Sequence, residues 1–259
     1  MWRLLVFLLL ISCVKISVIP LDGPDLEQFT GATKISRLVI TGSQLQDVDP
    51  LSSATFAKSL SITGNMELAN IDGLSNLAAA RMVYIGANPK LQNLDGLSNL
   101  TEIQRNIFIH DGVLSNIEGL SKLQFVGGTL SIGLDSSLTN LDGLSGLKFV
   151  GESFILADNT KLVNLEGVSN LRSVGEMVIV ANNALTEVGI SSLVSIEDRL
   201  NIQKNQSLVS LKGLTSLQTI KGDLRIADNP QLCQSEIDGF VDRVEVLGTV
   251  ISSGNDDSC

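Results

Sequence analysis

The sequence is poor in the residues on which most enzyme sites depend. It has one histidine, three cysteines and one tyrosine in 259 residues, and aromatic residues make up 4% of the chain. A single histidine excludes a metal site built from several imidazoles, and no serine or cysteine lies in a recognisable nucleophile motif. The sequence therefore predicts a protein that is not an enzyme and that needs no metal or other cofactor.

Basic residues and long apolar runs are also scarce. Lysine and arginine number 18 against 28 acidic residues, which gives a net charge of −10. Nucleic acid binding needs cations aligned on one face, and the linear sequence shows no basic stripe. After residue 11 there is no second apolar run of the length that crosses a membrane. The sequence therefore predicts no nucleic-acid partner and no membrane span.

Residues 1–17 have the pattern of a secretory signal peptide. Arg3 precedes an apolar run over residues 4–11, which is too short for a transmembrane helix but has the length of a signal-peptide core. Two interpretations stay open: LISC at residues 10–13 resembles a bacterial lipobox that would lipidate Cys13, whereas ordinary cleavage would discard Cys13. Both predict a secreted or cell-surface protein, attached to a membrane only if the lipid is present.

Residues 38–232 repeat with a period of 23 or 24 residues. Self-similarity at so constant a period indicates a solenoid in which each coil contacts only its neighbours. Each copy begins with an apolar-x-apolar step, such as Leu60-x-Ile62, which is typical of a short strand with one buried face. Nine marker leucines define the copies: Leu45, Leu68, Leu91, Leu114, Leu138, Leu162, Leu185, Leu208 and Leu232.

A polar residue follows each predicted strand. Its side chain is expected to be buried and to bind backbone groups that the turn leaves unpaired. The predicted ladder contains Asn65, Asn88, Asp135, Asn159, Asn183, Asn205 and Asn229, with Ser43 and Gly112 as exceptions. Glycines further along each copy are expected to allow a tight or positive-φ turn. These glycines are Gly73, Gly96, Gly119, Gly143, Gly167 and Gly213.

Both ends of such a stack need covering. Residues 18–37 are the predicted N-terminal cap, with Asp25 as a helix N-cap and Leu26 and Phe29 on its apolar face. Residues 233–259 are the predicted C-terminal cap, a helix followed by a final strand. Cys233 and Cys259 occupy equivalent places in adjacent coils, about 5 Å apart, and are expected to form a disulfide. The loop that it closes should contribute about 3 kcal/mol.

The repeated pattern L-x-I-x-x-N-x-x-L-x-x-L-D-G-L-S-x-L resembles that of the receptor L-domain family, as do the Val-Gly steps at 126–127, 150–151 and 174–175. The resemblance covers about residues 24–259. It implies a β-rich solenoid, a right-handed leucine-rich-repeat-like β-helix of about nine coils with a parallel sheet and helical caps at both ends. The chain is closest to the free-standing microbial cell-surface type, which implies a binding or surface role and names no ligand.

The outer face of the sheet is the predicted ligand-binding surface, because alternate strand residues point away from the core. The candidate residues are Tyr84, Phe108, His110, Ile155 and Ile179. An exposed apolar strip of this kind is typical of an interaction surface for an extracellular protein or glycan. In an alternative interpretation the strip packs against copies of the same chain in a structural cell-surface component.

Three weaker hypotheses concern other residues. A column of turn carboxylates could bind calcium, although solvated turn residues are the favoured explanation: Asp49, Asp72, Asp95, Glu118, Asp142 and Glu166, ended by Lys212. Arg199, Asp223 and Arg225 could imitate the site of a polysaccharide-cleaving β-helix enzyme. Asn99 begins a sequon that a eukaryotic host would glycosylate.

Overall fold

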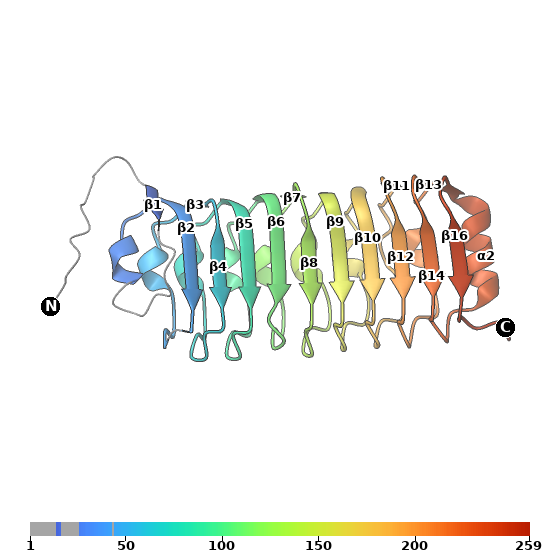
Figure 1. Ribbon diagram of the computed structural model, residues 1–259, viewed down its shortest axis with the longest axis horizontal. Coiled ribbons are helices and arrows are strands. Elements are labelled where there is room, and N and C mark those ends of the chain that lie inside the picture. The colour runs from blue at the N-terminus through green and yellow to red at the C-terminus, as the bar shows by residue number, and fades with distance from the viewer. Residues whose placement is uncertain (1–13, 17–25, 43) are drawn as a thin grey trace.

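A computed structural model describes residues 14–16, 26–42 and 44–259 as a single stack of parallel strands (Figure 1). The predicted signal-peptide core, Cys13, Asp25 and Ser43 lie outside the described residues. Among the helices that are described, none combines the length and the apolar character needed to cross a membrane. The mostly parallel β-rich architecture expected from the repeat is confirmed.

The strands are β1 (Val14–Ile16), β2 (Lys34–Thr41), β3 (Phe56–Ala57), β4 (Leu60–Thr63), β5 (Ala79–Gly86), β6 (Glu102–His110), β7 (Phe125–Val126), β8 (Leu130–Gly133), β9 (Phe149–Ala157), β10 (Ser173–Val180), β11 (Ser195–Ile196), β12 (Leu200–Gln203), β13 (Thr219–Ile220), β14 (Leu224–Ala227), β15 (Glu245–Val246) and β16 (Val250–Ser253). The helices are α2 (Gln234–Arg243) and the short 3-10 helices η1 (Glu27–Phe29), η2 (Asp49–Leu51), η3 (Asp72–Leu74), η4 (Asp95–Leu97), η5 (Glu118–Leu120), η6 (Asp142–Leu144), η7 (Glu166–Val168) and η8 (Lys212–Leu214).

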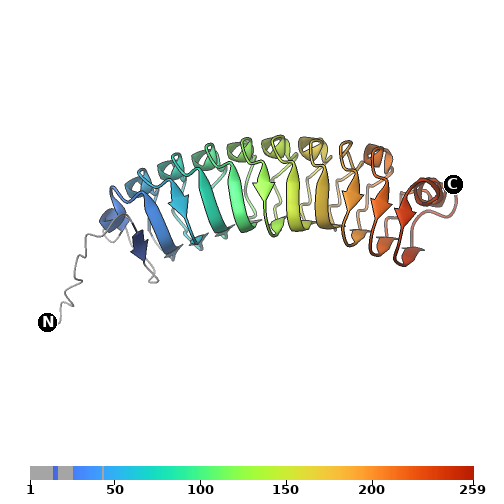
Figure 2. The same cartoon turned by 90° about the horizontal axis from the view of Figure 1, so that it is seen from above.

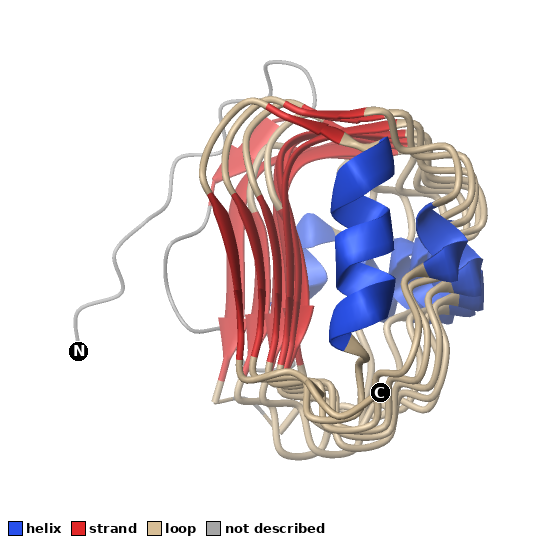
Figure 3. Cartoon of the chain, turned by 90° about the vertical axis from the view of Figure 1, so that its right-hand side faces the viewer, coloured by secondary structure: helices blue, strands red, loops and turns tan. Residues whose placement is uncertain are grey.

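The strands form two ladders that meet at a corner. The first ladder contains pairs such as Ala57 with Ala80, and the second contains pairs such as Tyr84 with Phe108. Long strands such as β5 and β6 bend through the corner and take part in both ladders. Seen along the stack, the strands line two sides of the coil and the 3-10 helices lie opposite the second ladder (Figure 3). The stack also curves, with the strands on its inner side (Figure 2).

The core runs the whole length of the stack. All of the marker leucines are buried, together with inward strand residues such as Leu60 and Ile62. Helix α2 lies across the C-terminal end of the stack, where Ile237 and Phe240 join the same apolar cluster (Figure 3). At the other end Leu26 and Phe29 belong to this cluster as well. The spacing of apolar residues therefore predicts which side chains meet inside each coil.

A row of buried polar side chains runs through the coils, with a gap at Asn159 Oδ1, which has no hydrogen-bond partner among the described residues. Its members are Asn65, Asn88, Asp111, Asp135, Asn159, Asn182, Asn205 and Asn229. In the repeating contact, the Asn65 side-chain nitrogen donates to Asn88 Oδ1 at 2.9 Å and to the Ile40 carbonyl at 3.2 Å in the coil before. The side chains thus satisfy backbone and amide groups of the neighbouring coils, as expected for a turn buried in a stack.

Two positions of the predicted ladder were wrong. Asn182 is the buried member and Asn183 is exposed, while Asp111 takes the place that the sequence reading left empty at Gly112. The error at Asn183 came from the tandem Asn182-Asn183, because either asparagine could be the buried ladder residue of this coil. In each of these coils the ladder residue lies three positions before the marker leucine, as Asn182 does before Leu185. That spacing would have selected both residues.

Asp111→Asn is expected to raise the thermal unfolding midpoint at pH 7 and to have a smaller effect at pH 3. Burial raises the pKa of Asp111, repulsion from Asp135 adds to this, and hydrogen bonds from the backbone and side chain of Asn88 oppose it. The folded state therefore binds this proton more tightly than the unfolded state, so stability falls as pH rises from the unfolded pKa through the folded pKa. Calorimetry at both pH values tests this, and an equal shift at both would contradict it.

The repeated glycines are required by close approach. None of the six has a positive φ, and a Cβ on Gly96, Gly119 or Gly143 would lie 1.8 Å from a backbone carbonyl oxygen of the preceding coil. Positive φ angles occur instead at the turn before the ladder residue, for example at Gly64 and Ala87. The expected positive φ is therefore wrong, and glycine is required because the backbone of the preceding coil lies against it.

The C-terminal segment returns to the stack as another strand. β16 pairs in parallel with β14, and Cys233 is bonded to Cys259 with 5.7 Å between their Cα atoms. The backbone of Cys233 also forms an isolated parallel β-bridge with that of Asp256. The disulfide thus joins the residue before α2 to the end of the chain, as the spacing predicted.

Candidate ligand-binding face

Tyr84, Phe108 and His110 lie together on the outer face of the second ladder. Tyr84 is on β5, and Phe108 and His110 are on β6. They alternate with buried residues such as Val83 and Ile109, so strand geometry directs their side chains away from the core. The register pairs Tyr84 with Phe108 and places His110 beside Gly86.

The three rings form one group, which we call the aromatic cluster. The ring centroids are 6.1 Å apart for Tyr84 and Phe108, 6.1 Å for Tyr84 and His110, and 6.2 Å for Phe108 and His110. Gly86 leaves room for it, because a Cβ there would lie 3.2 Å from Cε1 of Tyr84. Aromatic rings at these separations attract one another, and the Tyr84 ring still has 38% of its surface exposed.

His110 is held as a neutral ring. Its Nε2 lies 2.9 Å from the Ser131 hydroxyl oxygen, which fixes the side chain against the next strand. Burial lowers the pKa of His110 below its ordinary value, so the imidazole is uncharged at neutral pH. In that state it offers the cluster a flat surface and one hydrogen-bonding nitrogen already engaged by Ser131.

The two aliphatic candidates have different outcomes. Ile155 lies outward on β9 and is half-buried, as predicted, whereas Ile179 is buried in the core and was assigned to the wrong face. Its place is taken by Val178, which pairs with Ile155. Every residue from Met177 to Ala181 is apolar, so hydrophobicity does not distinguish the two possible registers of this strand. A shift of one residue moves every side chain to the opposite face.

A group of cations that the sequence reading missed lies beside the aromatic cluster. We call it the cationic groove, a hollow of about 580 Å³ at the corner between the two ladders. It is lined by Ser36, Arg37, Lys58, Ser59, Arg81, Met82, Arg105 and Asn106. Its cations are more than 20 residues apart in the sequence and meet only because successive coils stack. Each cation lies one or two positions before an inward strand residue, and this shared position is the signal that could have revealed them.

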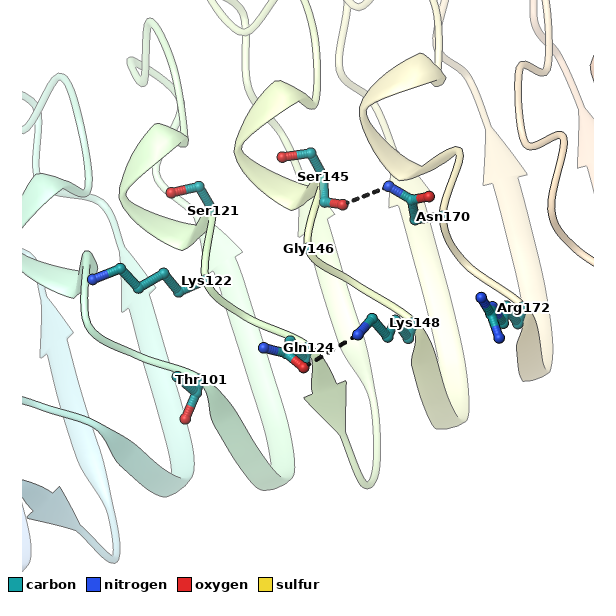
Figure 4. A pocket seen from close by; sticks show the side chains of 9 residues that line it. All are labelled: Thr101, Ser121, Lys122, Gln124, Ser145, Gly146, Lys148, Asn170 and Arg172. Carbon is teal, nitrogen blue, oxygen red and sulfur yellow. Dashed lines mark hydrogen bonds between the residues drawn. The ribbon is translucent and has the colours of Figure 1, made fainter.

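A second hollow, the flank hollow, lies between the 3-10 helices and the first ladder (Figure 4). It measures about 400 Å³, and its lining includes Lys122, Lys148 and Arg172. Two of these are engaged by neighbours, since Lys122 Nζ donates to Asn99 Oδ1 at 2.7 Å and Lys148 Nζ to Gln124 Oε1 at 3.4 Å. The flank hollow therefore offers positive charge without an aromatic surface.

The remaining candidates are engaged locally or lie on the surface. The carboxylates of the predicted calcium column are the exposed first residues of η2 to η7. The N-terminal end of a helix stabilises a negative charge, so this position explains the carboxylates without a metal. In the predicted lyase site, Arg199 pairs with Glu176, and Asp223 accepts from the Thr249 backbone nitrogen at 2.7 Å. Asn99 is exposed, and its side chain donates to the Ser75 carbonyl at 2.7 Å.

No protein-family model matches the chain, and no curated protein matches it. The likeness to the receptor L-domain family thus depends on the repeat pattern quoted above.

Proposed function

We propose that the chain is an exported, non-catalytic binding module that recognises a glycan or protein outside the cell through its outer sheet face. In this proposal it is a free-standing L-domain-like solenoid of about nine right-handed coils with a cap at each end. The observation that carries the proposal is the aromatic cluster, which gathers the only tyrosine and the only histidine of the chain on one exposed surface.

Several properties of the cluster support binding. Exposed aromatic side chains contribute large contact areas at a low cost in side-chain entropy, and they are common anchors of interfaces. Each ring is attached to a strand paired on both sides, so the surface is rigid before the ligand arrives. Beyond Ser131, the same outward row carries Ile155 and Val178. This ladder lies on the inner side of the curved stack (Figure 2). A ligand can thus contact several coils at once.

The proposal predicts that Tyr84→Ala/Phe108→Ala weakens ligand binding by at least about tenfold, because each aromatic anchor contributes about 1 kcal/mol or more to the binding free energy. Binding would be measured by biolayer interferometry against an immobilised panel of extracellular glycans and proteins. Both side chains are partly exposed, so the thermal midpoint should stay close to that of the unchanged protein.

Asn201→Ala/Gln203→Ala is the matched control, since on β12 Asn201 lies in the outward row of Tyr84 and Phe108, and Gln203 lies in the row of His110. It should leave binding unchanged. Equal affinity of the aromatic variant and the unchanged chain would contradict the proposal. If the aromatic variant instead abolishes self-association in sedimentation velocity, the structural cell-surface alternative is the correct one.

A further inference from the structure

The cationic groove and the aromatic cluster are consecutive parts of one surface. On β5, Arg81 and Met82 precede Tyr84; on β6, Arg105 and Asn106 precede Phe108. The register pairs Met82 with Asn106 and Tyr84 with Phe108, so the groove lining and the rings occupy adjoining rows. Met82 and Tyr84 each have 38% of their surface exposed. A molecule lying on one part therefore reaches the other.

The groove is an isolated patch of positive charge. Its eight lining residues include four cations, Arg37, Lys58, Arg81 and Arg105, and no carboxylate. Among the residues that the structure describes, the ion pairs are Lys90–Glu67, Arg199–Glu176 and Lys221–Glu197, so none engages a groove cation. Cations brought together in this way repel one another, and a bound anion would relieve that repulsion.

The charge at this corner changes sign further along the stack. Between the two ladders, the later coils carry Glu152, Glu176, Glu197, Asp198 and Asp223 against two cations, Arg199 and Lys221. Both of these cations are ion-paired, Arg199 with Glu176 and Lys221 with Glu197. Neighbouring strands are about 4.8 Å apart, so the cations of four coils span about 15 Å. The positive surface is therefore short, and it is followed by a surface on which carboxylates outnumber cations.

We propose that the cationic groove and the aromatic cluster form a single site for an acidic glycan, a short saccharide that carries carboxylate or sulfate groups. This inference rests on the proposed function and specifies its ligand class. The apolar faces of sugar rings pack on Tyr84 and Phe108, and the acidic groups bind Arg81 and Arg105, whose planar guanidinium groups match them in two-point contacts. Asn106 offers its side-chain nitrogen to sugar hydroxyls.

The charge pattern favours a short saccharide over nucleic acid. A long polyanion that follows the corner leaves the four cations and meets Glu152 and Asp198, which repel it, and the Glu176–Arg199 ion pair, which offers it no free cation. The chain as a whole carries a net charge of −10, which opposes any extended polyanion. An oligosaccharide of a few sugars fits within the positive stretch and still reaches the rings.

The test is isothermal titration of the full chain, as purified from its producing cells, at physiological salt. The probes are a heparin-derived hexasaccharide, a galacturonate hexasaccharide, neutral cellohexaose and a single-stranded DNA 12-mer. Binding of one or both acidic saccharides and not of cellohexaose is expected. Arg81→Ala/Arg105→Ala should weaken it by at least about tenfold, since charge-assisted hydrogen bonds are lost. All four of the groove cations are exposed, so the variant should keep its fold.

Lys148→Ala/Arg172→Ala, in the flank hollow, is the matched control for general charge effects. It removes the same net charge, and affinity should stay within about twofold because only long-range attraction changes. An equal loss in both variants would show a non-specific charge effect and overturn the proposal. DNA that binds as tightly as the saccharides, with the same dependence on Arg81 and Arg105, would overturn the glycan class.

The result for Tyr84→Ala/Phe108→Ala separates this inference from the proposed function. Loss of acidic-saccharide binding in both the arginine and the aromatic variant supports a single site. Loss in the arginine variant alone overturns the shared site. If no acidic saccharide binds but the aromatic variant loses another ligand of the panel, the ligand class is wrong and the proposed function stands.

Discussion

Gly119→Ala is expected to lower the free energy of unfolding by about 3 kcal/mol, at the upper end of overpacking effects. A Cβ at this position would lie 1.8 Å from the Leu94 carbonyl oxygen and 2.3 Å from its carbon, both in the backbone of the preceding coil. No side-chain rotation can relieve that contact, so adjacent coils must separate. Because each coil is stabilised by its neighbours, the damage should spread along the stack.

Urea unfolding followed by circular dichroism measures this effect, with Gly239→Ala as the control. Gly239 lies within α2 and has no atom within 4 Å of the Cβ position, so alanine there should stabilise the protein by about 0.5 kcal/mol through helix propensity. Similar unfolding midpoints for the two variants would show that the coils do not approach each other as closely as described.

Asn182→Ala is expected to cost about 3 kcal/mol, because several buried groups lose their partners together. Asn182 Oδ1 accepts from the backbone and side-chain nitrogens of Asn159, each at 3.1 Å. Its Nδ2 donates to the Leu156 carbonyl at 3.0 Å and to the Val180 carbonyl at 3.2 Å. Alanine would remove all four hydrogen bonds at a buried site. The Asn159 side-chain nitrogen would keep the Ile132 carbonyl, and the Val180 carbonyl would keep the Asp158 backbone nitrogen, whereas the Asn159 backbone nitrogen would lose Asn182 Oδ1.

Asn183→Ala provides an unusually close control. The residue is adjacent, has the same chemistry and is exposed, so its replacement should change stability by less than about 0.5 kcal/mol. Equilibrium unfolding of both variants compares the two registers directly. A large cost at Asn183 with a small cost at Asn182 would restore the register first inferred from the sequence and would return Ile179 to the outer face.

The sequence predicts the coil interior well because the fold is nearly one-dimensional. Marker leucines at a period of 23 or 24 residues can be buried together only if the chain makes one turn per repeat, and all of them are buried. The alternation at Leu60 and Ile62 then defines the strand. The same logic placed Cys233 and Cys259 in adjacent coils, where they are bonded. In this fold the period of the sequence therefore predicts which residues of adjacent coils are in contact.

The register at Met177–Val180 could not be read from hydrophobicity, because both faces of that strand are apolar. The position of the ladder residue relative to Leu185 carries the missing information. Asp111 was overlooked for a related reason, since its coil reaches the next leucine with one residue fewer after the strand than the coil of Asn88 does. In each case the spacing to the buried leucine decides the register.

The candidate site was predicted only in part, since Tyr84, Phe108 and His110 follow from strand alternation but the cationic groove does not. The groove depends on where the chain bends between the two ladders. There Arg81 and Arg105 occupy slightly different places in their strands, and the register shifts between Ala80 and Met82. A reading of charge along the sequence averages such residues with the many acids around them, so it cannot show a local cationic surface.

The most direct test of a shared site is an NMR titration of the isotope-labelled chain with the heparin-derived hexasaccharide. If the groove and the aromatic cluster act together, the largest shifts fall on the backbone amides of β5 and β6 and on the side-chain Nε–Hε signals of Arg81 and Arg105. Shifts centred on Lys148 and Arg172 in the flank hollow, or an absence of shifts at Tyr84 and Phe108, would contradict it.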